Sequence, residues 1–344
     1  MKRHLVLLLF ILVIPGTLLW DGFYRFLRPP TISDPIVRVV RILPGMSLKS
    51  IARLLEQEGL IQDTCKFLVL AWWKKTGKKV QWGDFELRTG MPPGTLLEYL
   101  VTGKTMLKRV TIPEGFTLQQ VAGRLTEENL VREKAFLDSA RDPDFLKALG
   151  ISGDSLEGYL FPDTYFFHRG MSIQTIQKRM VGRFQQVWGE LEREGVSAEA
   201  PSQNKMVILA SVVEKESGLG SERPLIASVF FNRLEKGMAL QSDPTVIYGL
   251  KNFNGDLTKK DLQKPGPYNT YIKPGLPPGP IANPGREALR AVLFPARSDY
   301  LYFVSKNDGS HCFSRTLKEH QRAVALYQLS LKSNSSSKKG RNKI

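Results

Sequence analysis

Apolar residues recur with helical spacing along much of the chain, and two of the segments that show this pattern resemble one another. RILPGMSLKSIARLLEQEGLI begins at Arg41, TIPEGFTLQQVAGRLTEENLV begins at Thr111, and the two align without gaps. Each copy runs through a glycine-containing turn to a Ser or Thr, after which apolar positions lie three and four apart. The pattern predicts a strand, a turn and an N-capped amphipathic helix in each copy.

The first copy continues through VQWGDFEL and PPGTLLEYLVTGK, which predict a further strand and a further helix. Residues 36–104 are therefore expected to form a small α+β domain. The strand–turn–helix pattern is similar to part of a LysM-like module, a fold associated with binding N-acetylated glycans. A duplicated structural unit that contacts no sugar explains the repeat equally well, because the pattern identifies no exposed binding residue.

The rest of the chain predicts a larger, mostly helical domain over residues 105–331, in which 105–150 holds the second copy. Helical patterns cover residues 133–150, 172–195, 204–217, 224–236 and, closing the domain, 317–331. EGYLFPDTYFF predicts a short extended segment, and DYLYFV and SHCFS predict a hairpin around the turn KNDG. Residues 332–344 are polar and basic, and we expect them to be disordered. The expected fold class is α+β.

One apolar helical pattern ends in two closely spaced glutamates. At about 100° per residue, Met206, Leu209 and Val213 share a face, and Glu216 borders it. Glu214 lies about 160° around the helix axis from Glu216. A carboxyl beside an apolar face is partly desolvated, which favours acid/base chemistry at Glu216. The alternative is that both glutamates are solvated charges in a last helical turn.

The N-terminus predicts a membrane anchor. Residues 5–20 are almost entirely apolar and follow a basic start. Bulky aromatic residues follow this run where a signal-peptide cleavage site would need small residues, and they suit a membrane interface. We expect residues 1–28 to be an uncleaved, single-pass signal anchor with a cytoplasmic tip. A linker at 29–35 would join it to a body outside the cytoplasm, and a cleaved signal peptide is the alternative.

Net charge, cysteines and histidines indicate which binding partners, metals and cofactors the chain is expected to have. The net charge of +16 suits an anionic membrane or cell-wall surface. No recognition-helix, RNA-binding or zinc motif supports a nucleic-acid partner. Cys65 and Cys312 lie far apart and are expected to be unpaired. The four histidines do not cluster, so we predict no metal site and no cofactor.

Several long strings in the C-terminal half carry a family resemblance. They are EGYLFPDTY from Glu157, FFNRLEKGMALQSDPTVIYGL from Phe230 and YNTYIKPGLPPGPIANPG from Tyr268. In order and content they closely resemble the YceG-like family of endolytic murein transglycosylases, over about residues 37–327. The resemblance implies a membrane-anchored lyase that cuts the glycan strands of peptidoglycan internally, with a lysozyme-like catalytic domain.

The resemblance also implies a reaction that needs one essential carboxyl. An acid protonates the oxygen between MurNAc and GlcNAc, and its carboxylate then takes the proton of the sugar's own C6 hydroxyl. The product is a 1,6-anhydroMurNAc end. Glu216 with Ser217 is similar to the Glu-Ser pair of lysozyme-like transglycosylases, which assigns the acid/base role to Glu216.

Further motif residues are candidates for binding the substrate. They offer hydrogen-bonding groups and aromatic faces suited to a sugar cleft, and they are Ser217, Asn232, Arg233, Gln241, Ser242, Asp243, Tyr248, Tyr268, Asn269 and Tyr271. Structural alternatives remain for some of them. Asp243 could N-cap a helix that starts at Pro244, Tyr268 and Asn269 could be structural, and Glu222 and Arg223 could be a surface ion pair.

The sequence thus favours an enzyme that terminates elongation of nascent glycan strands beside the membrane. A hydrolytic muramidase is an alternative, and it would want a second carboxylate to hold water, for which Asp243 is the only nearby motif acid. A non-enzymatic glycan-binding scaffold is another. Glycan strands and the membrane are the expected partners, and the resemblance adds a strand-polymerising synthase.

Overall fold

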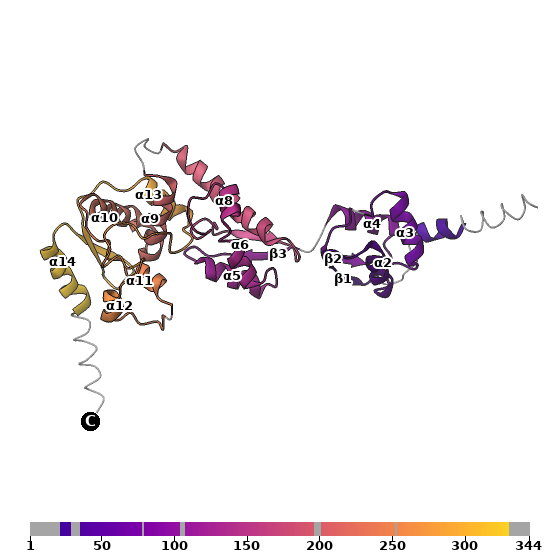
Figure 1. The fold of residues 1–344 in the computed structure, drawn as a ribbon, viewed down its shortest axis with the longest axis horizontal. Helices are drawn as coiled ribbons and strands as arrows, with labels where there is room; N and C mark the ends of the chain where they lie inside the picture. The colour runs from indigo at the N-terminus through magenta and orange to yellow at the C-terminus, as the bar shows by residue number, and fades with distance from the viewer. Residues whose placement is uncertain are drawn as a thin grey trace, which may run out of the picture. The chain divides into compact units, whose positions relative to one another are not determined.

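The computed structural model of the chain describes residues 21–28, 35–77, 79–103, 107–195, 201–251 and 253–329. The chain divides into two compact units, Met1–Arg109 with Phe166–Ser172 and Val110–Tyr165 with Ile173–Ile344. Helices and short two-stranded sheets make up both units, so the fold class is α+β as predicted (Figure 1). In the described ranges we find no helix that is both long and apolar enough to cross a membrane. The predicted apolar run at 5–20 and the tail at 332–344 lie outside those ranges.

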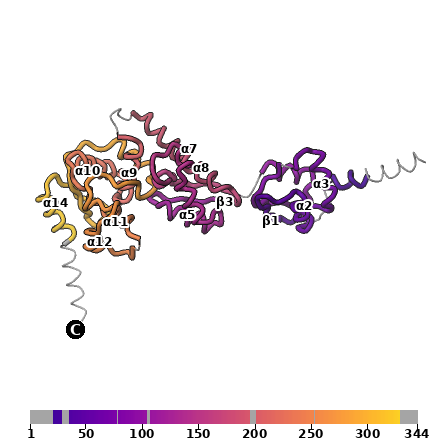
Figure 2. The backbone as a smooth tube through the Cα atoms, in the orientation of Figure 1, coloured from indigo at the N-terminus to yellow at the C-terminus, as the bar shows by residue number. Residues whose placement is uncertain are grey.

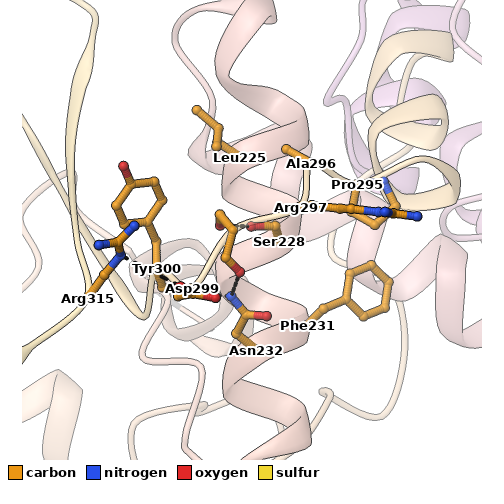
Figure 3. Close-up of a pocket in the computed structure, with 11 residues that line it drawn as sticks. Leu225, Ser228, Phe231, Asn232, Pro295, Ala296, Arg297, Asp299, Tyr300 and Arg315 are labelled. Carbon is orange, nitrogen blue, oxygen red and sulfur yellow. Dashed lines mark hydrogen bonds and ion pairs between the residues drawn. The ribbon is translucent and has the colours of Figure 1, made fainter.

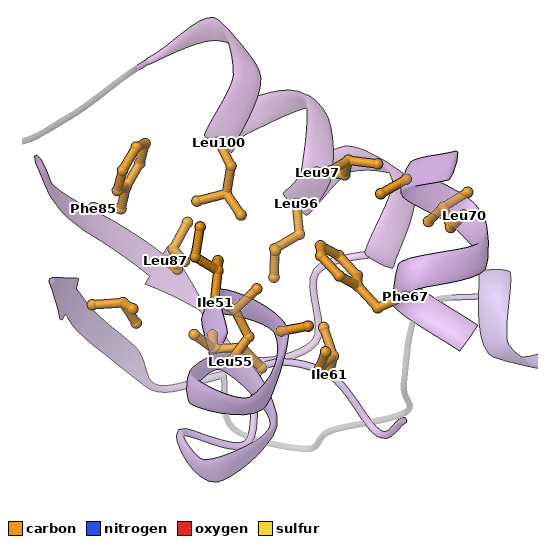
Figure 4. Packing of buried hydrophobic residues seen from close by; sticks show 14 of the residues in the cluster. Ile51, Leu55, Ile61, Phe67, Leu70, Phe85, Leu87, Leu96, Leu97 and Leu100 are labelled. Atoms are coloured by element: carbon orange, nitrogen blue, oxygen red, sulfur yellow. The ribbon is translucent and has the colours of Figure 1, made fainter. Parts of the chain in front are cut away.

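The first unit is built on an antiparallel pair of strands. β1 (Val37–Ile42) pairs with β2 (Gly83–Arg88). Three helices pack with this pair, α2 (Leu48–Gln57), α3 (Thr64–Trp73) and α4 (Pro93–Thr102). Their buried side chains form one apolar core (Figure 4), which includes Ile51, Leu55, Phe67, Leu70, Phe85, Leu87, Leu96 and Leu100.

A short helix at residues 21–27 belongs to the same core. Phe26 is 5% exposed within it, and Phe23 and Leu27 pack against it. The core of the first unit therefore begins before the linker predicted at 29–35.

Both copies of the sequence repeat form the predicted strand, turn and helix. β1 leads to α2, and β3 (Lys108–Thr111) leads to α5 (Leu118–Glu127). Ser47 and Thr117 cap the helices by accepting backbone N–H groups three residues ahead. Gly45 and Gly115 occupy matching turn positions with φ of 81° and 73°, a conformation that glycine adopts without strain.

Two further sheets contain two strands each. β3 pairs with β4 (Thr164–Phe167), and β5 (Tyr302–Ser305) pairs with β6 (His311–Ser314) in the predicted antiparallel hairpin. The remaining helices are α6 (Glu133–Ser139), α7 (Pro143–Ala148), α8 (Ile173–Glu192), α9 (Gln203–Glu216), α10 (Arg223–Glu235), α11 (Asp243–Gly249), α12 (Lys259–Gln263), α13 (Arg286–Leu293) and α14 (Leu317–Val324). A π-helical turn at Ala325–Leu329 follows α14.

The boundaries differ from the sequence-based ones where local chemistry interrupts a periodic pattern. The segment 133–150 forms two helices, because Asp142 accepts backbone N–H groups of a new first turn that starts with Pro143. In EGYLFPDTYFF only Thr164–Phe167 is a strand. The start of that string is a buried turn around Gly158, where φ is 87° and an added Cβ would lie 2.6 Å from Pro280.

Candidate active site

The helix α9 is buried on all sides for most of its length. Every residue from Met206 to Val213 is buried, and α10 and α13 pack against the helix (Figures 1 and 2). An α-helix that is apolar around its whole circumference requires such cover. Glu216 is its last residue, so the buried helix holds this glutamate in a fixed position.

Glu216 lines a cavity of about 450 Å³. The other lining residues come from α10, from α11 and the chain before and after it, from the β5–β6 hairpin, and from α14 with the π-helical turn that follows it. They are Arg233, Leu240, Gln241, Asp243, Tyr271, Phe303, Val304, Ser305, His311, His320, Val324 and Gln328. The cavity therefore joins Glu216 to four of the predicted binding residues, Arg233, Gln241, Asp243 and Tyr271.

The surroundings of Glu216 raise its pKa. Desolvation raises the pKa to about 7, and the neighbouring Asp243 adds to this. A hydrogen bond of 2.6 Å from the Ser242 hydroxyl to Oε1, and the charge of Arg233, act in the opposite direction. Near neutral pH the carboxyl is thus present in both protonation states, which suits a group that must donate and then accept a proton.

Arg233 is a buried cation in the cavity wall. Its Nε donates to the Leu301 carbonyl at 2.6 Å, and its Nη1 donates to the carbonyls of Leu240 at 2.8 Å and Ala239 at 3.3 Å. The guanidinium also lies over the Tyr302 ring, 5.1 Å from its centroid. Burial lowers the pKa of Arg233. These bonds fix a positive charge close enough to Glu216 to stabilise its carboxylate.

The segment Gln241–Asp243 is held by the loop that contains Thr270. Gln241 has φ of 50°, and its N–H donates to the Thr270 carbonyl at 3.0 Å. The Ser242 N–H donates to the Thr270 hydroxyl at 3.1 Å. Asp243 is the first residue of α11, where Ser242 occupies the N-cap position without a side-chain cap bond. The alternative that Asp243 N-caps this helix is therefore wrong, and its carboxylate instead accepts from Tyr271 Oη at 2.5 Å.

Asn232 and Asn269 hold backbone carbonyls rather than line this cavity. Asn232 Nδ2 donates to the carbonyls of Ser298 and Tyr300 at 2.8 and 2.9 Å. This places Asn232 in the wall of a second cavity of about 560 Å³ (Figure 3). Asn269 Nδ2 donates to the carbonyls of Leu262 and Lys264 at 3.0 and 2.8 Å, and its Oδ1 accepts the Tyr271 N–H at 2.9 Å.

Tyr248 and Tyr268 are half-buried and pack together in another cluster, beside the buried Glu157. Their ring centroids are 4.9 Å apart, and Tyr248 Oη donates to Glu157 Oε2 at 3.0 Å. Glu157 also accepts the Leu118 N–H at 2.9 Å and lies 3.2 Å from Asn283 Nδ2. Burial raises the pKa of Glu157 to about 7. Neither tyrosine is among the residues that line the Glu216 cavity.

The other glutamate of α9 lies in a closed ion-pair network. Glu214 is only 6% exposed at its side chain, accepts from Arg223 Nη2 at 3.0 Å and accepts the Gly285 N–H at 2.9 Å. Arg223 Nε donates to the Ser217 hydroxyl at 3.0 Å. The alternative that both glutamates are solvated is therefore wrong, as is the suggested surface pair of Glu222 with Arg223.

Sequence reasoning missed the two histidines of the cavity. His311 Nδ1 lies 2.7 Å from Glu222 Oε2, and the His320 ring stacks on Tyr302 at 5.2 Å. Burial and the nearby Arg233 lower the pKa of His320, and its buried Nδ1 has no hydrogen-bond partner within the described residues. The predicted hairpin placed His311 on an ordered strand, which was a local reason to consider it. No local pattern marked His320, in α14, as a residue of the site. Among the described residues, no three His, Cys, Asp or Glu side chains are grouped as metal ligands.

Comparison with known proteins identifies several relatives. The YceG-like family matches residues 40–326. An endolytic murein transglycosylase of Bacillus subtilis is 33% identical over 333 residues, covering 92% of this chain and 91% of that protein. One of Streptococcus pneumoniae is 31% identical over 320 residues, and the match covers 83% of this chain and 57% of that longer protein. A crystal structure of a yceG-like protein from Listeria monocytogenes is 34% identical with a TM-score of 0.55, covering 84% of this chain and 99% of that one.

Proposed function

The chain belongs to the YceG-like family, and on that premise we propose that it is a peptidoglycan lytic transglycosylase that cuts glycan strands internally. The matched region includes Glu216 and every residue of its cavity except Gln328. Relatives named as endolytic murein transglycosylases favour this activity over a non-enzymatic scaffold. The reaction breaks bonds between MurNAc and GlcNAc in nascent strands, leaves 1,6-anhydroMurNAc ends and terminates strand elongation.

The observation that carries the proposal is a desolvated carboxyl in the wall of a polar cavity. The pKa of Glu216 is about 7, so its protonated form is abundant at neutral pH. The protonated carboxyl donates to the glycosidic oxygen as the bond to C1 breaks. The resulting carboxylate accepts the proton of the C6 hydroxyl as that oxygen closes on C1. Glu216 therefore regains the proton that it donated, and no water molecule is consumed.

Neighbouring groups support each half of this cycle. The Ser242 hydroxyl fixes one carboxyl oxygen of Glu216, and the charge of Arg233 stabilises the carboxylate after the first proton transfer. Gln241 and Tyr271 offer hydrogen-bonding groups to the sugars, and so does His320 Nδ1, which has no partner among the residues that the structure describes. In this assignment four other predicted residues are structural, because each has a polar group bonded within the protein: Asn232, Asn269, Ser217 and Tyr248. Tyr268 packs its ring against Tyr248 and does not line the Glu216 cavity.

A hydrolytic muramidase is the second candidate, and Asp243 favours it. This carboxylate lines the same cavity as Glu216 and is close enough to raise its pKa. Hydrolytic glycosidases use such a second carboxylate to direct water or to form a covalent intermediate. In this chain Tyr271 already donates to one oxygen of Asp243, which leaves the other for a water molecule.

The end groups of the products separate the two reactions. Sacculi would be digested with the purified full chain in detergent, with the Glu216→Gln variant as control, and the new glycan ends identified by mass spectrometry. We expect 1,6-anhydroMurNAc ends that are absent from the control. Reducing MurNAc ends would favour the muramidase, and equal products from both proteins would remove Glu216 from the chemistry.

We further propose that the predicted anchor holds the chain in the cell membrane through its apolar run at 5–20, with both units outside the cytoplasm, since the helix at 21–27 packs in the core of the first unit. The apolar run at 5–20 and the basic residues before it support this topology. An anchored enzyme would work beside the synthases that polymerise strands. The full chain should stay with the membrane fraction at alkaline pH, and a shortened soluble form in cells would contradict the anchor.

Residues 36–104 are, in this proposal, a LysM-like glycan-binding unit. The two copies of the strand–turn–helix, with equivalent caps and turn glycines, support it. Binding of N-acetylglucosamine oligomers to the full chain carrying Glu216→Gln should shift NMR signals of the first unit. A spectrum in which only signals of the second unit move would mean that the repeat is structural alone.

A further inference from the structure

The helix α3 is apolar on both of its faces. Phe67, Leu70 and Ala71 face the core of the first unit and are buried. On the opposite side, Val69, Trp72 and Trp73 are 51%, 79% and 62% exposed. They lie three and four residues apart, so their side chains share one face of the helix. A helix that is apolar all round normally has cover on both sides, and tryptophan is rarely left so exposed.

Cations border this exposed face. Lys74 and Lys75 follow the two tryptophans directly and are exposed, and within the described residues they take part in no ion pair. Lys66 lies one turn before Val69, and its Nζ is 3.7 Å from Asp63 in an exposed ion pair, which contributes little. We call Val69, Trp72, Trp73, Lys74 and Lys75 the α3 face. It combines amphipathic aromatic rings with uncompensated positive charge.

The same unit also contains the residues that follow the apolar N-terminal run. Phe26 of the helix at 21–27 is buried in one core cluster with Phe67 and Leu70 of α3. Figures 1 and 2 draw this helix, in indigo, next to α3. The sequence from Trp20 into this helix is continuous. An anchor that ends near residue 20 therefore holds the α3 unit within a few residues' reach of the bilayer, where each residue spans at most about 3.6 Å.

We propose that the α3 face lies on the anionic lipid surface of the membrane that holds the anchor, with Trp72 and Trp73 at the level of the headgroups. Indole rings prefer this interface because their apolar body and polar N–H meet different surroundings there. Lysines beside them attract anionic headgroups. The inference rests on the proposed anchor, and it orients the first unit against the bilayer independently of the chemistry at Glu216.

The experiment measures how accessible the two tryptophans are in the full chain. The protein would be reconstituted in vesicles of phosphatidylcholine alone or mixed with phosphatidylglycerol and exposed to hydroxyl radicals. Mass spectrometry would give the oxidation rates of Trp72 and Trp73 relative to Phe253, which is exposed in the second unit. We expect the relative rate to be lower by about fivefold or more in the anionic vesicles, as interfacial burial of aromatic rings requires.

Two matched charge reversals test whether the lysines guide this contact. Lys74→Glu with Lys75→Glu should restore fast oxidation in anionic vesicles. Lys259→Glu with Lys260→Glu changes the same charge on an exposed pair in the second unit and should leave the protection intact. Equal oxidation in the two vesicle types would overturn the proposal. So would protection that rises with protein density in the vesicles, because that points to contact with a second copy.

The failure of this proposal can be distinguished from the failure of the anchor. Alkaline extraction of the same vesicles reports whether the chain is embedded. An embedded chain with fully oxidised tryptophans contradicts the α3 face alone. A chain that is extracted and also fully oxidised contradicts the anchor and the surface that depends on it.

Discussion

The two glutamates at the end of α9 lie in regions that are built differently, although the residues are only two positions apart. Burial raises the pKa of both carboxyls. Around Glu214, Arg223 and the Gly285 amide occupy both oxygens, and the side chain is 6% exposed. Around Glu216, the Ser242 hydroxyl is the only donor among the described residues, and the carboxyl borders a cavity of about 450 Å³.

The comparison shows that a raised pKa does not by itself identify an acid catalyst. A carboxyl whose oxygens are both bonded within the protein cannot transfer its proton without breaking those bonds. Glu214 is therefore suited to joining α9, α10 and the chain before α13. No donor within the described part of the chain bonds the second oxygen of Glu216, which lies next to space for a substrate. The following predictions test this division of roles.

The largest effect is expected from Glu216→Gln. The substitution preserves shape but removes the proton that must shuttle, so the rate of glycan cleavage should fall by on the order of 10²-fold or more. Glu214→Gln is the matched control, and its catalytic loss should be far smaller in protein that remains folded. Release of soluble glycan from sacculi measures both. Full activity of the Glu216→Gln variant would contradict the acid/base role assigned to Glu216.

The pH dependence of cleavage should report the pKa of Glu216. The protonated form starts the reaction, and its pKa is raised to about 7. Activity should thus be level on the acidic side and fall about tenfold per pH unit above that value. The alkaline fall should persist in Glu214→Gln. Activity that rises through pH 8 would mean that an ionised group begins the reaction.

The two glutamates should affect stability in opposite directions. Glu214→Gln sets an amide donor against Arg223 or the Gly285 N–H, which should reduce the free energy of unfolding by roughly 1–3 kcal/mol. Glu216 binds its proton more tightly when folded, so its contribution to stability falls as pH rises from 4.5 to about 7.

Glu216→Gln should therefore leave stability unchanged below this window and raise it above the window by roughly 3 kcal/mol. Urea unfolding of both variants at pH 4 and pH 8 measures these differences. A loss of stability in Glu216→Gln at pH 8 would show that the Glu216 carboxylate stabilises the fold, as the Glu214 carboxylate does.

The smallest effect is expected from Ser242→Ala. Its hydroxyl lowers the pKa of Glu216, so its removal should move the alkaline fall of activity to higher pH. The rate on the acidic side should change only a few-fold, since one neutral hydrogen bond is lost. Ser217→Ala removes a hydroxyl that bonds Arg223 and should leave the pH profile in place. If both variants shift the profile alike, the Ser242 bond is not specific to Glu216.

The fold was largely predictable where the signal is local. Helical spacing with Ser47 or Thr117 at the N-cap was enough to identify both copies of the repeat, because a cap and its first turn lie within a few residues. Helical phase also separated Glu216 from Glu214. Boundaries were less accurate where a cap such as Asp142 starts a new helix inside an apparently continuous pattern.

The partners of the site residues could not be predicted, because they depend on contacts between distant segments. Asn232 and Asn269 look like ligand-binding amides in the sequence, yet each holds two backbone carbonyls. The Gly285 N–H that donates to one oxygen of Glu214 lies 71 residues away in the sequence. His320 enters the cavity only because α14 packs beside β5.

Arg233 links two segments of the cavity wall, so they should open together. Its guanidinium bonds carbonyls at 239 and 240 on one side and at 301 on the other. The planar guanidinium presents several N–H donors in fixed directions, whereas the single ammonium of a lysine could not bond all three carbonyls in this arrangement. Transient opening of the chain before α11 should therefore free the chain before β5 in the same event. In native-state hydrogen exchange, these two stretches would behave as one cooperative unit despite their separation in sequence.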